Sequence, residues 1–399
     1  MRVCLWGTFD PEHVRNRVIK TGLEQAGAEV VVCHRSLWRG RGERVRESAR
    51  QRLNLSLIGR GLAAYWHLCW CLLTMARPDV VLVGYPGQID ALIARPICWL
   101  RRMPLVLDAF LSIYETAVTD RKLVPKRSWR ARLLWCLERQ SCRGADLVLL
   151  DTEADCAFFQ NAYGVGRYAR VWVGAPEPSV VAPARRSTGD DTFDVLFVGT
   201  FIPLHGIEHI LRAAKLLATS APEVRITFIG SGQMYTEMRL LAQGLALDNV
   251  EWGPSWLDEP ELSERAARAD LILGVFGTSA KAQRVIPAKA YAALAAGRPL
   301  VTADTPGSRE ALTHDETALL CPPGDPKALA SAILAVRANR AEADQIAANG
   351  QALYWQRFAP RPIGELLLAL LRPLVRRTSH FTAAPPESRR HRRSDRPQP

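Results

Sequence analysis

Short runs of apolar and β-branched residues recur along the first half of the chain, separated by stretches with helical periodicity. The runs occupy residues 3–6, 29–33, 79–83, 104–108, 146–150 and 170–173. Strands that are apolar throughout and alternate with helices are typical of a parallel sheet covered by helices on both faces. The pattern therefore predicts a doubly wound, Rossmann-like α/β domain over residues 1–175.

A second set of apolar runs follows a stretch rich in Pro, Gly, Ser and charged residues, which predicts a linker at 176–192. These runs lie at 194–198, 225–229, 271–275 and 299–303, again between helical patterns. One predicted helix, 325–336, starts with Asp325 as its cap and Pro326 in its first position. The second half thus predicts another Rossmann-like domain at 193–357, facing the first across a cleft.

The end of the chain departs from this alternation. An amphipathic stretch at 363–375 is followed by no strand, so we expect a helix over 358–375 that crosses back to the first domain. Residues 376–399 carry seven Arg against Glu387 and Asp395 and have few apolar residues. This composition predicts a disordered basic tail.

Composition narrows the class of protein. No apolar run in the 399 residues reaches the length of a membrane-spanning helix, and Asp10 and Glu12 interrupt the N-terminus too early for a signal peptide. The nine Cys are scattered without a CxxC pair, which favours free thiols in a reducing compartment over disulfides or zinc. We therefore expect a cytoplasmic protein that holds no metal.

The net charge of +12 is unevenly placed. Residues 35–60 carry eight Arg against two Glu and run directly into the apolar stretch 61–75, which contains Trp66 and Trp70. A basic segment beside a Trp-containing helix is typical of a surface that lies on anionic lipid, so residues 35–75 are a candidate membrane contact at the inner face of the cell membrane. The alternative is a solvated loop followed by a buried helix. The Arg clusters match no nucleic-acid-binding motif, which argues against such a partner.

Ligands of doubly wound sheets bind at loops that follow the carboxyl ends of strands. The first such loop has one Gly where a dinucleotide-binding fingerprint has three, which disfavours an NAD site. Its residues form the candidate acceptor side, with helix-surface solvation of the Arg side chains as the alternative: Gly7, Thr8, Phe9, Arg15, Asn16 and Arg17.

In the second half, Gly-containing loops at 199–206 and 230–232 follow predicted strands, which allows the backbone to approach a ligand. Pro287 suits the first turn of a helix that Gly297 ends, and Lys281, Arg284 and Lys289 crowd the start of this helix. Three cations at the positive end of a helix dipole indicate a pyrophosphate site.

The segments GTFIPLHGIEHILRAAKLL, FIGSGQ, NVEWG, LAAGRPLV, TPGSREAL and ALLCPPGDPKALASAI, in this order, resemble the second domain of family-4 (group 1) glycosyltransferases of GT-B fold. In the first domain, LWGTFDPEHVRNR, LVLDAFLSIYETAVTDR and LLDTEAD resemble one bacterial branch of that family, which also has an FGTSxKAQRVIPxK segment.

The resemblance implies a hexosyltransferase-type enzyme that moves a sugar from a nucleotide-diphosphate donor to a hydroxyl with retention, without cofactor or divalent metal. The absence of an Asp-x-Asp pair agrees with the last point. The acceptor is expected to be a saccharide or a lipid-linked saccharide, in polysaccharide or glycolipid synthesis. Asp108, after an apolar strand at the cleft edge, is the candidate catalytic residue. The candidate donor-binding residues are Gly199, Thr200, His205, Gly230, Gly232, Arg284, Pro287, Lys289 and Glu310.

The sequence departs from the family's usual residues at three positions. The family carries two Glu residues eight positions apart, and those positions hold Arg284 and Ala292 here. His205 stands where related enzymes often place Lys. Losing a charged hydrogen bond to a ligand weakens affinity roughly 10- to 100-fold. A catalytically degenerate homologue that acts as a binding or scaffolding partner is therefore the alternative. A sugar-nucleotide epimerase is disfavoured, because its expected set of carboxylates is absent.

Overall fold

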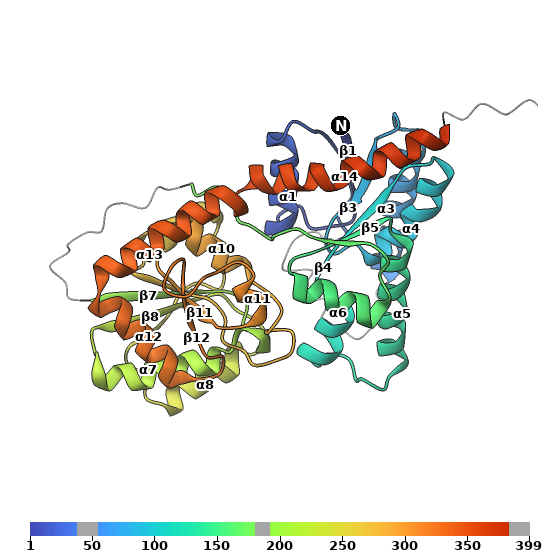
Figure 1. The fold of residues 1–399 in the computed structure, drawn as a ribbon. Coiled ribbons are helices and arrows are strands. Elements are labelled where there is room, and N and C mark those ends of the chain that lie inside the picture. Colours follow the sequence, from blue (N-terminus) through green and yellow to red (C-terminus); the bar gives the residue numbers. More distant parts are fainter. Residues whose placement is uncertain (38–54, 180–191, 383–399) are drawn as a thin grey trace, which may run out of the picture.

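The computed structural model describes residues 1–37, 55–179 and 192–382 (Figure 1). The first half forms a parallel six-stranded sheet with the strand order β2-β1-β3-β4-β5-β6. The strands are β1 Arg2–Gly7, β2 Glu29–His34, β3 Val80–Val83, β4 Leu105–Phe110, β5 Leu147–Leu150 and β6 Tyr168–Arg170. The run expected at 170–173 is therefore a strand that ends at Arg170, and the rest of it is buried coil.

The helices of this domain divide between the two faces of its sheet. Apolar residues of α1 Val14–Gln25 share a core cluster with those of α14 Pro360–Thr382. The remaining helices share another cluster, on the opposite face. They are α3 Leu55–Thr74, α4 Gln88–Leu100, α5 Trp129–Gly144 and α6 Glu153–Tyr163, and the π-helix η1 Glu115–Asp120 precedes α5. This division follows from right-handed crossovers, because strand order reverses at β1.

The second half repeats the architecture with the strand order β12-β11-β10-β7-β8-β9, all parallel. The strands are β7 Phe193–Val198, β8 Val224–Ile229, β9 Val250–Trp252, β10 Leu271–Leu273, β11 Leu300–Ala303 and β12 Leu319–Cys321. The helices are η2 Pro203–His205, α7 Ile207–Ser220, α8 Tyr235–Gly244, α9 Glu259–Arg268, α10 Ala288–Ala295, α11 Pro306–Arg309, α12 Pro326–Ala338, α13 Arg340–Leu353 and η3 Tyr354–Phe358. Both doubly wound domains are thus confirmed. The three-residue strands β9 and β12 were not among the predicted runs.

Local sequence explains where these helices begin and end. The Asp325 carboxylate accepts hydrogen bonds from the backbone N–H groups of Lys327 and Ala328, so it caps α12 as expected. Pro287 precedes α10, and Gly297, at φ +61°, follows its end. The predicted start of α10 is therefore confirmed, and the helix presents its free N–H groups beside Lys289.

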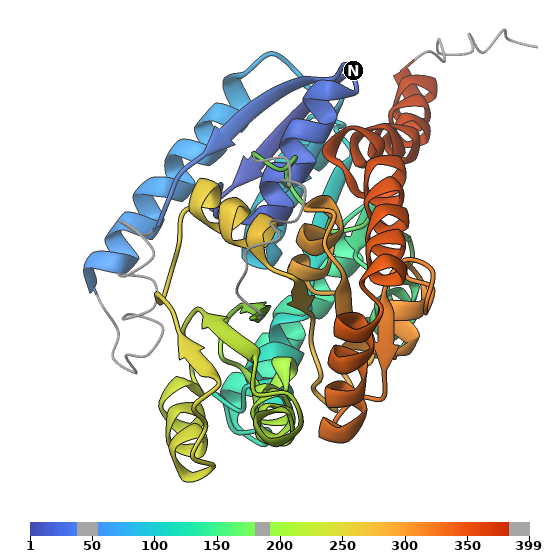
Figure 2. The same ribbon diagram turned by 90° about the vertical axis from the view of Figure 1, so that its left-hand side faces the viewer.

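The C-terminal helix α14 returns to the first domain and crosses α1 at two glycines (Figures 1 and 2). A Cβ on Gly364 would lie 1.8 Å from the carbonyl oxygen of Gly22, so only glycine permits this close approach of the two backbones. The helix continues to Thr382, and the tail boundary expected at residue 376 is wrong. Residues 383–399 and most of the predicted linker lie outside the described residues, as does most of the basic segment 35–60.

The described ranges contain neither a membrane-spanning helix nor a cluster of metal ligands. In these ranges no helix is both long enough and apolar enough to cross a bilayer. The same ranges contain no group of three or more His, Cys, Asp or Glu side chains arranged to hold a metal ion.

Candidate functional site

Lys289, in the first turn of α10, has an ammonium group that is buried without a counter-charge. Its Nζ lies 3.7 Å from the centre of the Phe197 ring and has no hydrogen-bond partner among the described residues. The backbone of Gly199 lies against it, since a Cβ added there would be 2.5 Å from Nζ. Burial alone lowers the pKa of Lys289 well below its ordinary value. The site therefore lacks the anion that a buried ammonium requires.

His205 ends η2 next to this lysine. A Cβ on Gly199 would lie 2.9 Å from its Cε1, and its Nδ1 is buried without a hydrogen-bond partner in the described part of the chain. Burial, with a smaller contribution from Lys289, lowers the pKa of His205 well below its ordinary value, so the imidazole is neutral. The structure thus places two buried nitrogen atoms without hydrogen-bond partners, Lys289 Nζ and His205 Nδ1, beside Gly199.

The two Gly-containing loops pack backbone against backbone beside these groups. A Cβ on Gly230 would lie 2.0 Å from the Gly199 carbonyl oxygen, and one on Gly232 would lie 2.7 Å from the Phe201 nitrogen. Gly230 also has φ +133°, which disfavours any other residue. Thr200, directly after Gly199, is exposed to solvent. The expected assembly of residues 199–205, 230–232, Pro287 and Lys289 at one edge of the second sheet is therefore present.

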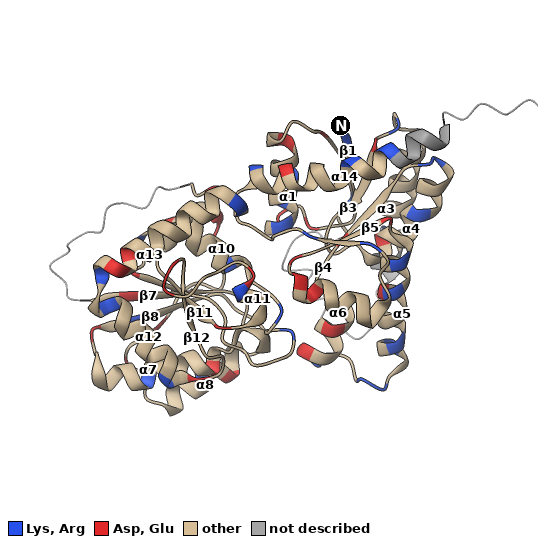
Figure 3. Cartoon of the chain, viewed as in Figure 1, with Lys and Arg blue, Asp and Glu red and all other residues tan. Residues whose placement is uncertain are grey.

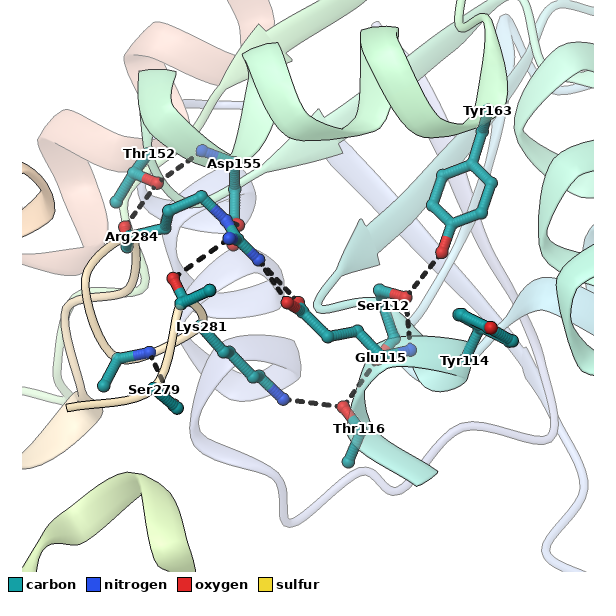
Figure 4. Close-up of polar contacts among 12 residues, drawn as sticks. Ser112, Tyr114, Glu115, Thr116, Thr152, Asp155, Tyr163, Ser279, Lys281 and Arg284 are labelled. Atoms are coloured by element: carbon teal, nitrogen blue, oxygen red, sulfur yellow. Dashed lines mark hydrogen bonds and ion pairs between the residues drawn. The ribbon is translucent and has the colours of Figure 1, made fainter. Parts of the chain in front are cut away.

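Arg284 lies five residues before Lys289 in the chain but points to the other domain (Figure 4). Its guanidinium Nη2 lies 2.5 and 2.6 Å from the carboxylate oxygens of Glu115 in η1, and its Nε lies 2.9 Å from Asp155 Oδ1 in α6. The guanidinium also lies 4.1 Å from the centre of the Phe158 ring. Two carboxylates therefore neutralise Arg284, and its expected placement against donor phosphate is wrong in this structure. We call these three residues the Arg284 bridge.

Other polar contacts join the domains around the Arg284 bridge. Lys281 Nζ donates to Thr116 Oγ1 at 2.6 Å, and Thr152 Oγ1 donates to the carbonyl oxygen of Arg284 at 2.8 Å (Figure 4). The Glu310 carboxylate accepts from the backbone N–H groups of Glu153 and Ala154, at 2.7 and 2.9 Å. Glu310 therefore caps α6 of the first domain rather than standing free to contact a donor.

Asp108 lies inside the first domain. Both of its oxygens accept from Arg15 Nε, at 2.7 and 2.8 Å, and both side chains are fully buried. Arg15 also donates to the carbonyl oxygen of Val171, at 2.8 Å. Burial raises the pKa of Asp108, and Arg15 opposes this shift. The expectation that Asp108 lies at the cleft edge is therefore wrong, because no atom of its carboxylate reaches solvent.

The remaining candidates on the acceptor side hold the loop after β1. The backbone N–H of Thr8 donates to Asp90 at 2.6 Å, and the left-handed Gly7 leaves no room for a Cβ beside the same carboxylate. Asn16 donates to the carbonyl oxygens of Asp10 and Tyr85, at 2.7 and 2.6 Å.

The outer candidates of the same loop lie apart from one another. The Phe9 side chain is buried against the His34 ring. Arg17 forms an ion pair with Glu259, at the start of α9 in the second domain. In the ligand-free protein these candidates make structural contacts, and Arg17 joins the two domains. Their role on the acceptor side stays a prediction.

Sequence reasoning missed the acidic half of the interdomain contacts. Glu115 and Asp155 lie in segments singled out for their resemblance, yet both pair with Arg284 of the other domain. Asp151 is fully buried, and neither of its oxygens has a hydrogen-bond partner among the described residues. Burial and the neighbouring Asp155 raise its pKa well above the ordinary value. No sequence periodicity signals such pairs.

Two parallel six-stranded sheets, each covered by helices on both faces, give the chain the two-domain α/β architecture of the GT-B fold. Residues 183–353 match the family model for glycosyl transferases group 1, and residues 13–174 match that for the glycosyl transferase 4-like domain. The chain therefore belongs to the group 1 glycosyltransferases, as its sequence motifs indicated.

Curated relatives match parts of the chain. The D-inositol 3-phosphate glycosyltransferase of Pseudarthrobacter chlorophenolicus is 28% identical over 196 residues, covering 46% of this chain and 45% of the relative. That of Kribbella flavida is 30% identical over 210 residues, covering 48% of each. An exopolysaccharide phosphotransferase of Streptomyces coelicolor is 33% identical over 135 residues, 33% of this chain and 14% of the relative. The chain spans about half or less of the length of these relatives.

Solved structures share the fold over nearly the whole chain. Sucrose-phosphate synthase from Thermosynechococcus elongatus superposes with a TM-score of 0.69 at 18% identity, covering 96% of this chain and all (100%) of that one. HepE from Anabaena, in complex with UDP, superposes with a TM-score of 0.65 at 18% identity, covering 93% and 99%. The GT-B fold expected from the sequence is thus confirmed.

Proposed function

We propose that this group 1 glycosyltransferase transfers a hexose from a nucleotide-diphosphate donor to a hydroxyl acceptor, with retention of anomeric configuration. The observation that carries the proposal is Lys289, whose buried ammonium lacks an anion in the ligand-free protein. Support for a nucleotide-sugar donor comes from HepE, whose structures hold UDP and UDP-glucose.

The chemistry follows from where Lys289 stands. In the transfer, the bond between the anomeric carbon and the diphosphate oxygen breaks, the acceptor oxygen forms the new bond, and its proton is released. Negative charge grows on the diphosphate as it leaves. A preorganised cation and the N–H groups at the start of α10 stabilise that charge in the transition state more than they stabilise the bound donor before transfer. Lys289 thus takes the part that a divalent cation plays elsewhere, and we propose a reaction without metal or cofactor.

The acceptor is proposed to be a saccharide or lipid-linked saccharide, in the synthesis of a cell-surface polysaccharide or glycolipid. An exopolysaccharide enzyme stands among the curated relatives, over a third (33%) of the chain. We keep the cytoplasm, at the inner face of the membrane, as the proposed location.

Titration calorimetry with UDP tests the proposal. Lys289→Met removes the ammonium and fills its space, and we expect UDP affinity to fall roughly 10- to 100-fold. Lys215→Met, on the exposed side of α7, is the matched control and should leave affinity unchanged. Transfer from radiolabelled nucleotide sugars to membrane lipid extract then measures activity. Unchanged UDP affinity in Lys289→Met would refute the diphosphate site.

A second candidate is favoured by Ala292 and by the Arg284 bridge, because neither family position offers a carboxylate to the donor. In that case the chain is a degenerate homologue that acts as a binding or scaffolding partner of an active transferase. The two are separated by combining the assays. An enzyme binds UDP and transfers or hydrolyses the donor sugar, whereas a scaffold does not turn over any donor and binds no nucleotide diphosphate even at high concentration.

A further inference from the structure

Large apolar side chains are exposed on one side of the first domain. Eleven of the 17 exposed large hydrophobic residues of the described chain lie between Leu62 and Trp135. On α3, Leu68 and Leu72 are fully buried against the sheet, while Trp66 and Trp70 on the opposite side are 76% and 59% exposed. A soluble helix ordinarily turns polar residues to that side. The outer side of α3 thus exposes apolar side chains that no other described element covers.

The two helices next to α3 repeat this arrangement. Trp99, at the end of α4, is 74% exposed, and Trp129, at the start of α5, is 69% exposed. Helices α3, α4 and α5 pack in this order on the same face of the sheet (Figure 1). We call the outer side of these three helices the tryptophan face, after Trp66, Trp70, Trp99 and Trp129. Trp129 and Trp99 lie at opposite ends of neighbouring helices, so the exposed tryptophans are spread along this side of the domain. Exposed apolar surface of this extent marks an interaction site.

The charges around the tryptophan face are of one sign. Asp90 and Glu138 are the acidic residues of α3, α4 and α5, and both are buried with hydrogen-bond partners inside the domain. Arg130 and Arg132 on α5 are exposed, and Figure 3 shows basic residues along α5. On α4, Arg95 is partly exposed and pairs with Asp146. The guanidinium of Arg130 lies 5.7 Å from the Trp129 ring centre.

We propose that the tryptophan face docks on the surface of an anionic lipid bilayer. Trp side chains prefer the boundary between headgroups and acyl chains, and Arg side chains beside them bind lipid phosphate. A second copy of this chain fits less well, because a symmetric contact would bring the same unpaired Arg residues together. Because none of the described helices is able to span a bilayer, the helices lie on the membrane rather than in it.

This inference deepens the proposed function, on which it rests for its acceptor. Docking through the first domain leaves the Lys289 site, on the other domain, in the aqueous phase with the water-soluble donor. A lipid-linked acceptor is then supplied from the surface that α3 to α5 contact. The predicted membrane segment 35–75 overlaps this face at α3, and the proposal adds α4 and α5 to it.

Flotation of the full chain with lipid vesicles tests the inference. The probes are vesicles of phosphatidylcholine alone and of phosphatidylcholine mixed with phosphatidylglycerol. We expect binding to the anionic vesicles, and the Trp66→Ala/Trp99→Ala variant should reduce the partition coefficient roughly tenfold. The matched control, Trp256→Ala/Trp355→Ala, removes two exposed Trp side chains from the second half of the chain and should leave binding unchanged.

Charge-reversal variants measure the electrostatic contribution to vesicle binding. Arg130→Glu/Arg132→Glu should abolish most of the preference for anionic vesicles, more than roughly tenfold, since each cation at such a surface contributes about a fivefold factor. The control Arg212→Glu/Arg225→Glu changes the same charge on the second domain. Equal vesicle binding by wild type and both Trp variants would overturn the inference, as would a dimer that Trp66→Ala/Trp99→Ala dissolves.

UDP titration of the same variants keeps the two proposals separate. Loss of vesicle binding with unchanged UDP affinity is the expected result for the tryptophan face. Failure of UDP to bind the wild type would refute the diphosphate site and leave the vesicle result standing.

Discussion

Two cations five residues apart, Arg284 and Lys289, meet opposite environments. Arg284 has two carboxylates and an aromatic ring around it, all from the other domain. Lys289 lies over the Phe197 ring, beside the Gly199 backbone and His205, and has no hydrogen-bond partner in the described residues. A paired cation holds structure together, whereas an unpaired buried one has binding energy left for a ligand. The comparison assigns domain closure to Arg284 and diphosphate binding to Lys289.

The largest effect is expected from removing the paired cation. Arg284→Met leaves Glu115 and Asp155 buried without their counter-charge, so the free energy of unfolding should fall by about 3 kcal/mol. Denaturant titration measures the loss, and small-angle X-ray scattering should show a larger radius of gyration as the domains separate.

The control for this change is Arg309→Met, which removes an exposed Arg from its ion pair with Asp304 and should have little effect. Adding Glu115→Gln to Arg284→Met should recover part of the lost stability, because one of the orphaned charges is then gone. If Arg284→Met weakened UDP binding while leaving stability and shape unchanged, the assignment of Arg284 to domain closure would be wrong.

Removing the unpaired cation should stabilise the ligand-free protein, whereas removing the paired cation destabilises it. Lys289→Met removes a buried group with a lowered pKa, so at neutral pH the free energy of unfolding should rise by about 1–3 kcal/mol. At pH values between the lowered pKa of the folded protein and the ordinary value of 10.5, the Lys289 side chain is protonated in the unfolded chain and deprotonated in the folded one. Stability of the wild type should therefore rise with pH over that window, and the variant should lack this rise.

UDP binding gives a second way to measure the titration of Lys289. The diphosphate favours the charged form of Lys289, so UDP binding should take up protons above the lowered pKa, and affinity should fall as pH rises. Calorimetry in buffers of different ionisation enthalpy counts these protons. A pH-independent affinity without proton uptake would show that Lys289 does not contact the diphosphate.

The architecture was predictable because local patterns determine it. Apolar runs separated by helical periods predicted both sheets, and Asp325 and Pro287 predicted the starts of α12 and α10. The three-residue strands β9 and β12 escaped because runs so short resemble buried loop. Helix α14 extends past residue 376 and contains Pro373 in its interior, although a proline there predicts that a helix ends.

The site was predictable only in part, because partners of charged groups come from distant sequence. Lys289 and the glycines around it lie together as expected, because each follows a strand that ends at the same edge of the sheet. Their binding of a donor stays a proposal. Asp108 was misplaced because its partner, Arg15, lies 93 residues away. Glu310 was expected at the donor, yet it caps a helix of the other domain, 157 residues away. Periodicity carries no information about such pairs.

The smallest effect is expected on UDP affinity, from a substitution at Gly199 beside Lys289. Gly199→Ala keeps the charge, but its Cβ would lie 2.5 Å from Lys289 Nζ and 2.9 Å from His205 Cε1, so both side chains must shift. We expect UDP affinity to fall roughly tenfold or less, because the lysine end is flexible and adapts. Gly244→Ala, at the end of α8, adds the same methyl group into open space and should leave affinity unchanged. Equal affinities for the two variants would mean that UDP binds away from Gly199, and the Lys289 site would then have to be abandoned.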